Sequence, residues 1–96
     1  MEILNTHIGN VLTTEDITIR GILDGQLSVN AYHNAHIFGI VTKDVIAYKD
    51  STVRINGIVK GDVINKGGVI EIYGIVKGRL TTIDGDTRIS PNAIVR

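Results

Sequence analysis

Residues 55–65, INGIVKGDVIN, carry the pattern that decides the fold of this chain. Every second residue from Ile55 to Val63 is aliphatic or glycine, and the residues between them are mixed. A period of two is the spacing at which side chains fall on one face of a β-strand. The composition agrees, because 27 Ile and Val residues stand against five Leu and β-branched residues favour strands. We therefore expect an all-β protein.

The alternation repeats along the chain every 17 to 18 residues. Four segments, residues 18–35, 36–53, 54–70 and 71–87, are followed by a shorter stretch at residues 88–96. Each full segment has a leading glycine, and these are Gly21, Gly39, Gly57 and Gly74. A second glycine follows at Gly25, Gly61 and Gly78, with Lys43 as the exception, and Pro91 takes the glycine slot in the last stretch. Such a period is typical of a solenoid, in which each repeat must stack on its neighbours to bury its inward face.

Each repeat has room for about three short strands separated by bends. We expect about five coils in a single domain spanning residues 1–96, with the glycines where the chain turns around a narrow interior. Residues 30–35, 48–52, 65–68 and 83–86 have the composition of turns and should form corners. The first 16 residues have no leading glycine and are expected to form an incomplete coil.

Charge and composition exclude several classes of function. Ten Lys and Arg balance ten Asp and Glu, so there is no basic excess to attract nucleic acid and no net repulsion between copies. The absence of cysteine excludes disulfides and thiolate chemistry. No apolar run reaches the ~18 residues of a membrane span, and the N-terminus lacks the pattern of a signal peptide. We expect a cytoplasmic protein.

The two ends of the solenoid are the first candidate interaction surface. Terminal coils leave backbone groups and inward apolar side chains without a partner, and a second copy could supply one. The candidate self-association residues are Ile3, Leu4, Ile8, Ile89, Ile94 and Val95. Pro91 lacks an N–H group and would limit such pairing, so a dimer and a filament both stay open.

An outward row of apolar residues is the second candidate surface. It consists of Ile22, Phe38, Ile40, Ile58, Tyr73 and Ile75. An exposed apolar row on a monomer often marks a partner site. The alternatives are that the faces of a solenoid tolerate scattered aliphatic residues, or that the N-terminal residues fold over the row.

Catalytic and metal-binding patterns are weak. His33 and His36 form an H-x-x-H pair without further ligands, and Asp84 and Asp86 lack the other oxygen ligands of a calcium loop. The GIVKG stretches lack the Lys-Ser/Thr ending of a phosphate-binding loop. We interpret these residues as solvated turns, and we expect no enzyme, no catalytic or metal site and no cofactor.

The run INGIVKGDVIN resembles the bactofilins, a family of polymer-forming bacterial cytoskeletal proteins. Residues 6–27, THIGNVLTTEDITIRGILDGQL, and residues 81–96, TTIDGDTRISPNAIVR, are similar to the start and end of a bactofilin domain. The resemblance implies a right-handed, three-sided β-helix that assembles without nucleotide through its ends. It implies as partners further copies of the chain, another bactofilin or cell-envelope proteins, and a place in the cytoplasm or at the inner face of the cell membrane. Many bactofilins have an N-terminal membrane-targeting segment, whereas Ile3 and Leu4 are the only apolar pair before the similarity here, which argues against membrane attachment.

Two alternatives remain open from the sequence. A left-handed hexapeptide solenoid enzyme is one, since a six-residue series of aliphatic residues runs from Ile17 to Val59, although it breaks at Asn65. The other is a small solenoid that binds one protein partner as an adaptor or inhibitor through the outward isoleucines.

Overall fold

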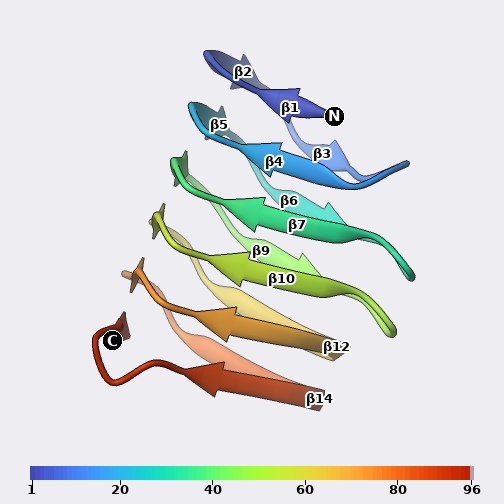
Figure 1. The fold of residues 1–96 in the computed structure, drawn as a ribbon, viewed down its shortest axis with the longest axis vertical. Helices are drawn as coiled ribbons and strands as arrows, with labels where there is room; N and C mark the ends of the chain where they lie inside the picture. The colour runs from blue at the N-terminus through green and yellow to red at the C-terminus, as the bar shows by residue number, and fades with distance from the viewer. Residues whose placement is uncertain (96) are drawn as a thin grey trace.

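The chain winds into a coil of short parallel strands, as the ribbon in Figure 1 shows. The computed structural model describes residues 1–95, and over that range it contains fifteen strands and no helix. The expected all-β solenoid of about five coils is confirmed. With no helix in the described range, none is available to cross a membrane.

The strands stack into three sides. The first side contains β1 (Glu2–Ile3), β4 (Ile17–Ile19), β7 (Asn34–Ile37) and β10 (Thr52–Ile55). The second contains β2 (Thr6–Ile8), β5 (Ile22–Asp24), β8 (Ile40–Val41), β11 (Ile58–Val59), β13 (Ile75–Val76) and β15 (Ile94–Val95). The third contains β3 (Val11–Leu12), β6 (Leu27–Val29) and β9 (Val45–Ala47). Two long strands continue from the third side into the first, β12 (Val63–Ile72) and β14 (Leu80–Ile89).

The coil is right-handed. In Figure 1, β4 crosses the front from right to left and β6 returns behind it from left to right, while successive coils descend from the N-terminus to the C-terminus. This path contradicts the left-handed hexapeptide alternative. The molecule measures 29 × 26 × 16 Å along its principal axes.

Each strand pairs in parallel with the strand one coil away. Thr52 pairs with Asn34 in the preceding coil and with Val69 in the following one. The N-terminal segment follows the same rule, because Glu2 pairs with Thr18, and β2 and β3 pair with β5 and β6. The expectation of an incomplete first coil is therefore wrong, since residues 1–16 form a complete coil that is one to two residues shorter than the others.

Alternate side chains fill a single apolar core. The predicted inward phase is confirmed from Ile17 to Val76, with Lys43 exposed. The buried apolar residues are Ile3, Val11, Ile17, Ile19, Leu23, Leu27, Val29, Ala35, Ile37, Val41, Val45, Ala47, Val53, Ile55, Val59, Val63, Ile70, Ile72 and Val76. The first and third sides each contribute two inward rows to this core and the second side contributes one, and the rows pack against one another.

The leading glycines bring the backbones of neighbouring coils together. A Cβ atom on Gly57 would overlap the carbonyl oxygen of Gly39, and the other leading glycines are equally crowded by the preceding coil. The Gly57 N–H donates to the Ile37 carbonyl at 2.8 Å. These glycines are therefore required by the close contact between coils. The expectation that a narrow interior requires them is wrong.

The corner between the third and first sides changes along the solenoid. In the longer coils it is a turn containing Tyr32 or Asp50, both at φ 65°. In the shorter coils Gly67 and Gly85, at φ 139° and 83°, bend the chain inside β12 and β14. The turns expected at residues 65–68 and 83–86 are thus bends within continuous strands, because a glycine at positive φ redirects the chain without ending the ladder.

A buried asparagine completes the corner inside β12. The Asn65 side chain is fully buried, and its Oδ1 accepts from the backbone N–H groups of Gly67 at 3.1 Å and Gly68 at 2.8 Å. Its Nδ2 donates to the Gly68 and Asp86 carbonyls and to Thr87 Oγ1 at 2.9–3.1 Å. Asn65 therefore links its own corner to the next coil.

We predict that Gly57→Ala lowers the free energy of unfolding by roughly 3 kcal/mol, because fixed backbone on the preceding coil leaves no space for a methyl group. Thr52→Ala, an outward substitution on β10, is the control and should cost less than about 1 kcal/mol. Urea unfolding followed by far-UV circular dichroism measures both. Equal losses for the two variants would contradict the proposed contact between coils.

We predict that Asn65→Ala also lowers the free energy of unfolding by about 3 kcal/mol, because it leaves buried backbone donors and acceptors without a partner. The control is Asn56→Ala, which removes an exposed hydrogen bond that Asn56 Oδ1 accepts from His36 Nε2. That variant should lie within about 1 kcal/mol of the parent in the same urea titration. A tolerated Asn65→Ala would show that water can replace the side chain at this corner.

Candidate functional site: the terminal coils and the isoleucine column

The C-terminal end of the solenoid exposes residues from the inward register. Ile89 pairs below Ile72, which is fully buried, yet Ile89 itself is 50% exposed. Leu80 and Val95 occupy the corresponding inward positions on the other two sides and are only partly buried. The described residues therefore leave the core open at this end.

The same end presents a long strand edge. β14 spans ten residues and, among the described residues, pairs only with β12. Its other edge carries a row of backbone N–H and C=O groups available to a further strand. Figure 1 shows β14 as the last rung across the front of the solenoid. Unpaired strand edges of this kind are templates for association with another chain.

The N-terminal end is closed by comparison. Ile3 and Val11 point inward in the first coil and are only 5% and 8% exposed, and Thr13 is also buried. The inward position on the second side is taken by His7, which pairs with Leu23 and is exposed. The one exposed inward position of these three sides in the first coil is thus held by a polar side chain, His7. The two ends of the solenoid consequently differ in chemistry.

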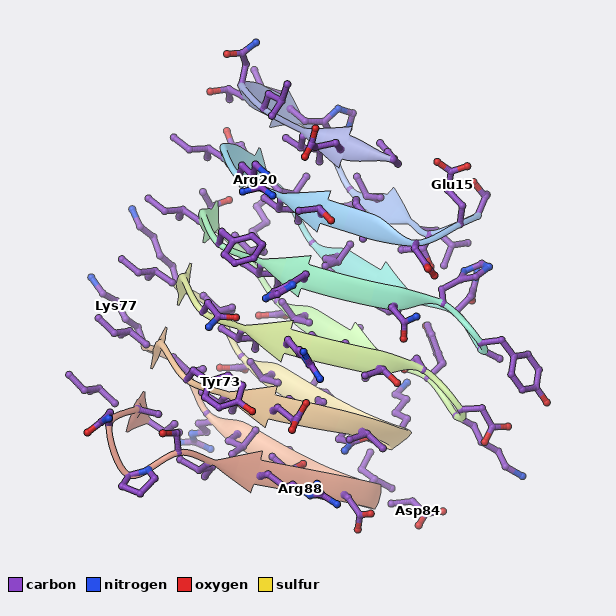
Figure 2. All side chains as sticks on the ribbon, viewed as in Figure 1. Glu15, Arg20, Tyr73, Lys77, Asp84 and Arg88 are labelled. Atoms are coloured by element: carbon purple, nitrogen blue, oxygen red, sulfur yellow. The ribbon has the colours of Figure 1, made fainter. Side chains whose placement is uncertain are left out.

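The N-terminal amino group is tied to the entry of the second coil. It lies 2.6 Å from a Glu15 carboxylate oxygen and donates to the Asp16 carbonyl at 2.9 Å. The hydrogen bond and the positive charge of this ammonium group lower the pKa of Glu15. Figure 2 shows Glu15 at the turn that precedes β4. These contacts fix the position of the first strand on the first side.

The candidate end residues occupy different positions. Ile3 belongs to the core, while Leu4 and Ile8 are exposed. Ile89 lies at the open C-terminal end, and Val95 is partly buried beneath Val76. The last candidate, Ile94, points outward and pairs with Ile75.

Four of the predicted outward residues form one continuous column. Ile22, Ile40, Ile58 and Ile75 pair in register on the second side, and Ile94 extends the row by one coil. We call these five residues the isoleucine column. The first coil contributes Thr6 at the top of the row and does not fold over it.

The two aromatic residues lie beside this column, at the corner with the first side. Phe38 stacks against His36 with ring centroids 3.9 Å apart, and the Arg20 guanidinium lies 4.9 Å from the Phe38 ring centre. The Tyr73 hydroxyl donates to Glu71 at 3.2 Å. Figure 2 shows Arg20 and Tyr73 at the same edge, in different coils.

The third side has outward isoleucines that the sequence reasoning missed. Ile46 and Ile64 pair with one another and are half-buried, between Ser28 above and Thr81 below. The 18-residue spacing of Ile46 and Ile64 would have identified them. Because polar residues flank them along the row, they form a shorter apolar strip than the isoleucine column.

The two histidines of the H-x-x-H pair have separate partners. His33 Nδ1 hydrogen-bonds with Thr13 Oγ1 at 3.0 Å, and His36 lies on β7 with its Nε2 2.7 Å from Asn56 Oδ1. Asp84 and Asp86 lie within β14, where Asp84 accepts from the Gly85 N–H. Within residues 1–95, no three His, Asp or Glu side chains gather as a metal site would require.

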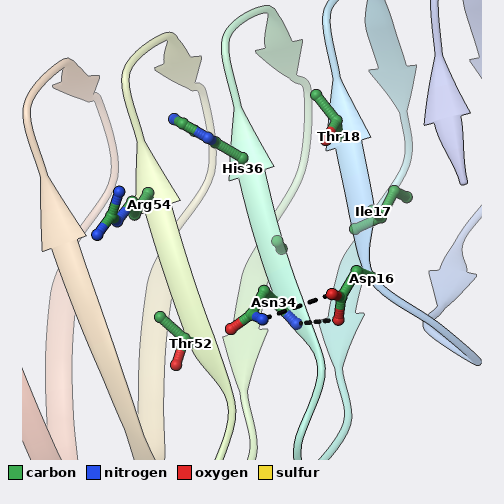
Figure 3. Close-up of a pocket in the computed structure, with 8 residues that line it drawn as sticks. Asp16, Ile17, Thr18, Asn34, His36, Thr52 and Arg54 are labelled. Atoms are coloured by element: carbon green, nitrogen blue, oxygen red, sulfur yellow. Dashed lines mark hydrogen bonds between the residues drawn. The ribbon is translucent and has the colours of Figure 1, made fainter.

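A shallow hollow of about 420 Å³ lies on the first side (Figure 3). It is lined by Asp16, Ile17, Thr18, Asn34, Ala35, His36, Thr52 and Arg54. Of its charged groups, Asp16 accepts from the Asn34 N–H at 2.8 Å, and Arg54 Nε lies 2.9 Å from a Glu71 carboxylate oxygen.

Comparison of the chain with protein-family models, curated proteins and solved structures gives no match.

Proposed function

We propose that this chain is a self-assembling structural scaffold whose copies associate end to end through their terminal coils, without a nucleotide. The observation that carries the proposal is the open C-terminal end, where inward residues and a ten-residue strand edge face solvent. In a solenoid the natural partner for such a surface is one more coil, because the hydrogen bonds and side-chain rows of every inner coil are completed by a neighbour.

Contact with a second copy would bury the residues that this end exposes. Complete burial of an isoleucine contributes roughly 1.5–3 kcal/mol, so the half-exposed Ile89 would contribute about 1 kcal/mol. Leu80 and Val95 add smaller amounts because they are already partly buried. Hydrogen bonds to the free edge of β14 would supply direction and register.

The resemblance of the repeats to bactofilins supports a cytoskeletal role for such an assembly. On that basis we infer that copies of this chain are the main partner, with another bactofilin or cell-envelope proteins as further partners. The inferred location is the cytoplasm or the inner face of the cell membrane. The proposal makes the chain a structural protein and not an enzyme.

We predict that the purified 96-residue chain forms assemblies whose size grows with concentration, and that Ile89→Arg abolishes them by placing a charge in the open core. Sedimentation velocity from about 10 μM to 1 mM measures the size distribution, and negative-stain microscopy detects filaments. Tyr32→Arg is the matched control, because Tyr32 is a large exposed residue at a corner away from both ends.

Two results would contradict the proposal. One is a parent chain that stays monomeric across the concentration series. The other is equal loss of assembly in Ile89→Arg and Tyr32→Arg, which would place the contact elsewhere. Far-UV circular dichroism of each variant separates lost assembly from lost folding.

A further inference from the structure

We propose that two copies of this chain also pair side by side through the isoleucine column, with their coils in opposite order. This inference is independent of end-to-end assembly and assigns a second copy as the occupant of the second side. It rests on a continuous apolar row and on the charges that flank it.

The apolar row is the longest on the surface of the solenoid. The isoleucine column continues through five consecutive coils, at a spacing of ~4.8 Å between neighbouring strands. By contrast, the row on the first side that contains Thr18, His36 and Arg54 is polar. A flat apolar row of this kind suits a partner with the same spacing, and a second copy has it.

The residues next to the column change charge along the solenoid. They follow the isoleucines by two positions and therefore point outward as well, in the order Asp24, Thr42, Lys60 and Lys77. Asp24 accepts a hydrogen bond from Thr42 at 2.9 Å. No ion pair in the described part of the chain involves Asp24, Lys60 or Lys77. Figure 2 shows Lys77 extending away from the body at this edge.

Reversing one copy makes these charges complementary. A two-fold axis between the Ile40 and Ile58 rungs places each Ile40 opposite Ile58 of the second copy. The same operation places Asp24 opposite Lys77 of the second copy. Because the interface is isologous, the ion pair forms twice.

A pair with coils in the same order is less favourable. It would place Asp24 opposite Arg20 of the second copy, and Arg20 is already held by Glu2 at 3.0 Å and by the ring of Phe38. Lys77 would meet no acidic group. Opposite charges across an interface select partner and orientation, so the reversed order is preferred.

The ends of the second side provide a further match. Ile8 and Ile94 are 79% and 63% exposed and stand at opposite ends of this side. In the reversed pair, Ile94 lies opposite Thr6 of the second copy, next to Ile8 in the neighbouring column, and this contact also forms twice. Ile8 and Ile94 thus adjoin at both ends of the proposed interface.

The contact area sets the expected strength. The side is at most 29 Å long and its strands β5 and β8 have only three and two residues, roughly 7–10 Å across. Its area is therefore well below the ~800 Å² per partner of a standard interface. We therefore expect a dissociation constant of about 0.1–1 mM for an isolated pair. A stack of copies would join many such contacts and bind far more tightly.

The experiment measures pairing in a chain whose open end is blocked. Sedimentation equilibrium of Ile89→Arg up to about 2 mM should show a monomer–dimer equilibrium. Adding Asp24→Lys should weaken the dimer at least about tenfold, since two attractive pairs become repulsive. Combining Asp24→Lys with Lys77→Asp should restore the dimer to within about threefold, because the reversed pairs are attractive again.

An apolar test uses two matched isoleucines. Ile58→Thr should weaken the dimer at least about fivefold, whereas Ile64→Thr, on the third side and equally half-buried, should leave it unchanged. Threonine keeps the β-branch, and circular dichroism confirms that both variants fold.

A monomer throughout the series for Ile89→Arg would overturn the proposal, and so would a double charge reversal that fails to restore pairing. Equal effects of Ile58→Thr and Ile64→Thr would also overturn it. The outcome is separate from end-to-end assembly, because a dimer in Ile89→Arg without filaments in the parent would contradict only the proposed scaffold function.

Discussion

Backbone hydrogen bonding between coils is the interaction on which this structure depends. In residues 1–95 every strand pairs with a strand about one coil away, and no ladder there joins two strands of the same coil. A coil alone would therefore satisfy few of its backbone groups and would bury little of its apolar face. The leading glycines permit this contact, since any side chain there would separate the coils. For the same reason, each terminal coil has one strand edge with no neighbouring coil to pair with.

The two terminal coils meet this constraint differently. The first coil closes the interior, because Ile3, Val11 and Thr13 are covered and the exposed inward position is held by the polar His7. The last coil continues the inward register with Ile89 in solvent. Association at the C-terminal end therefore gains apolar burial as well as backbone hydrogen bonds, whereas the N-terminal end offers mainly its strand edges.

Sequence periodicity predicted the repeated part of the fold and failed where the repeat changes. Alternation identified the inward residues from Ile17 to Val76 and the register of the isoleucine column. It predicted an incomplete first coil, because Asn5 replaces the leading glycine there and the spacing falls to 16 residues. It placed Asn65 inward but not its bonds to Asp86 and Thr87, which depend on how the next coil bends. Periodicity also could not predict which residues of the terminal coils are exposed, because that depends on how each terminal coil covers the interior.

Coils that stack in register place equivalent inward residues above one another, and they do the same for outward residues. Where successive repeats have the same outward residue, that residue forms a row. On the second side this produces identical side chains at identical spacing, and such a row could slide along a partner in steps of one coil. The change from Asp24 to Lys60 and Lys77 reduces that degeneracy, because unlike charges meet only where Asp24 of one copy lies opposite one of these lysines of the other. In the proposed side-by-side pair, the isoleucine column supplies apolar attraction, and the charged residues beside it set the register of the two copies.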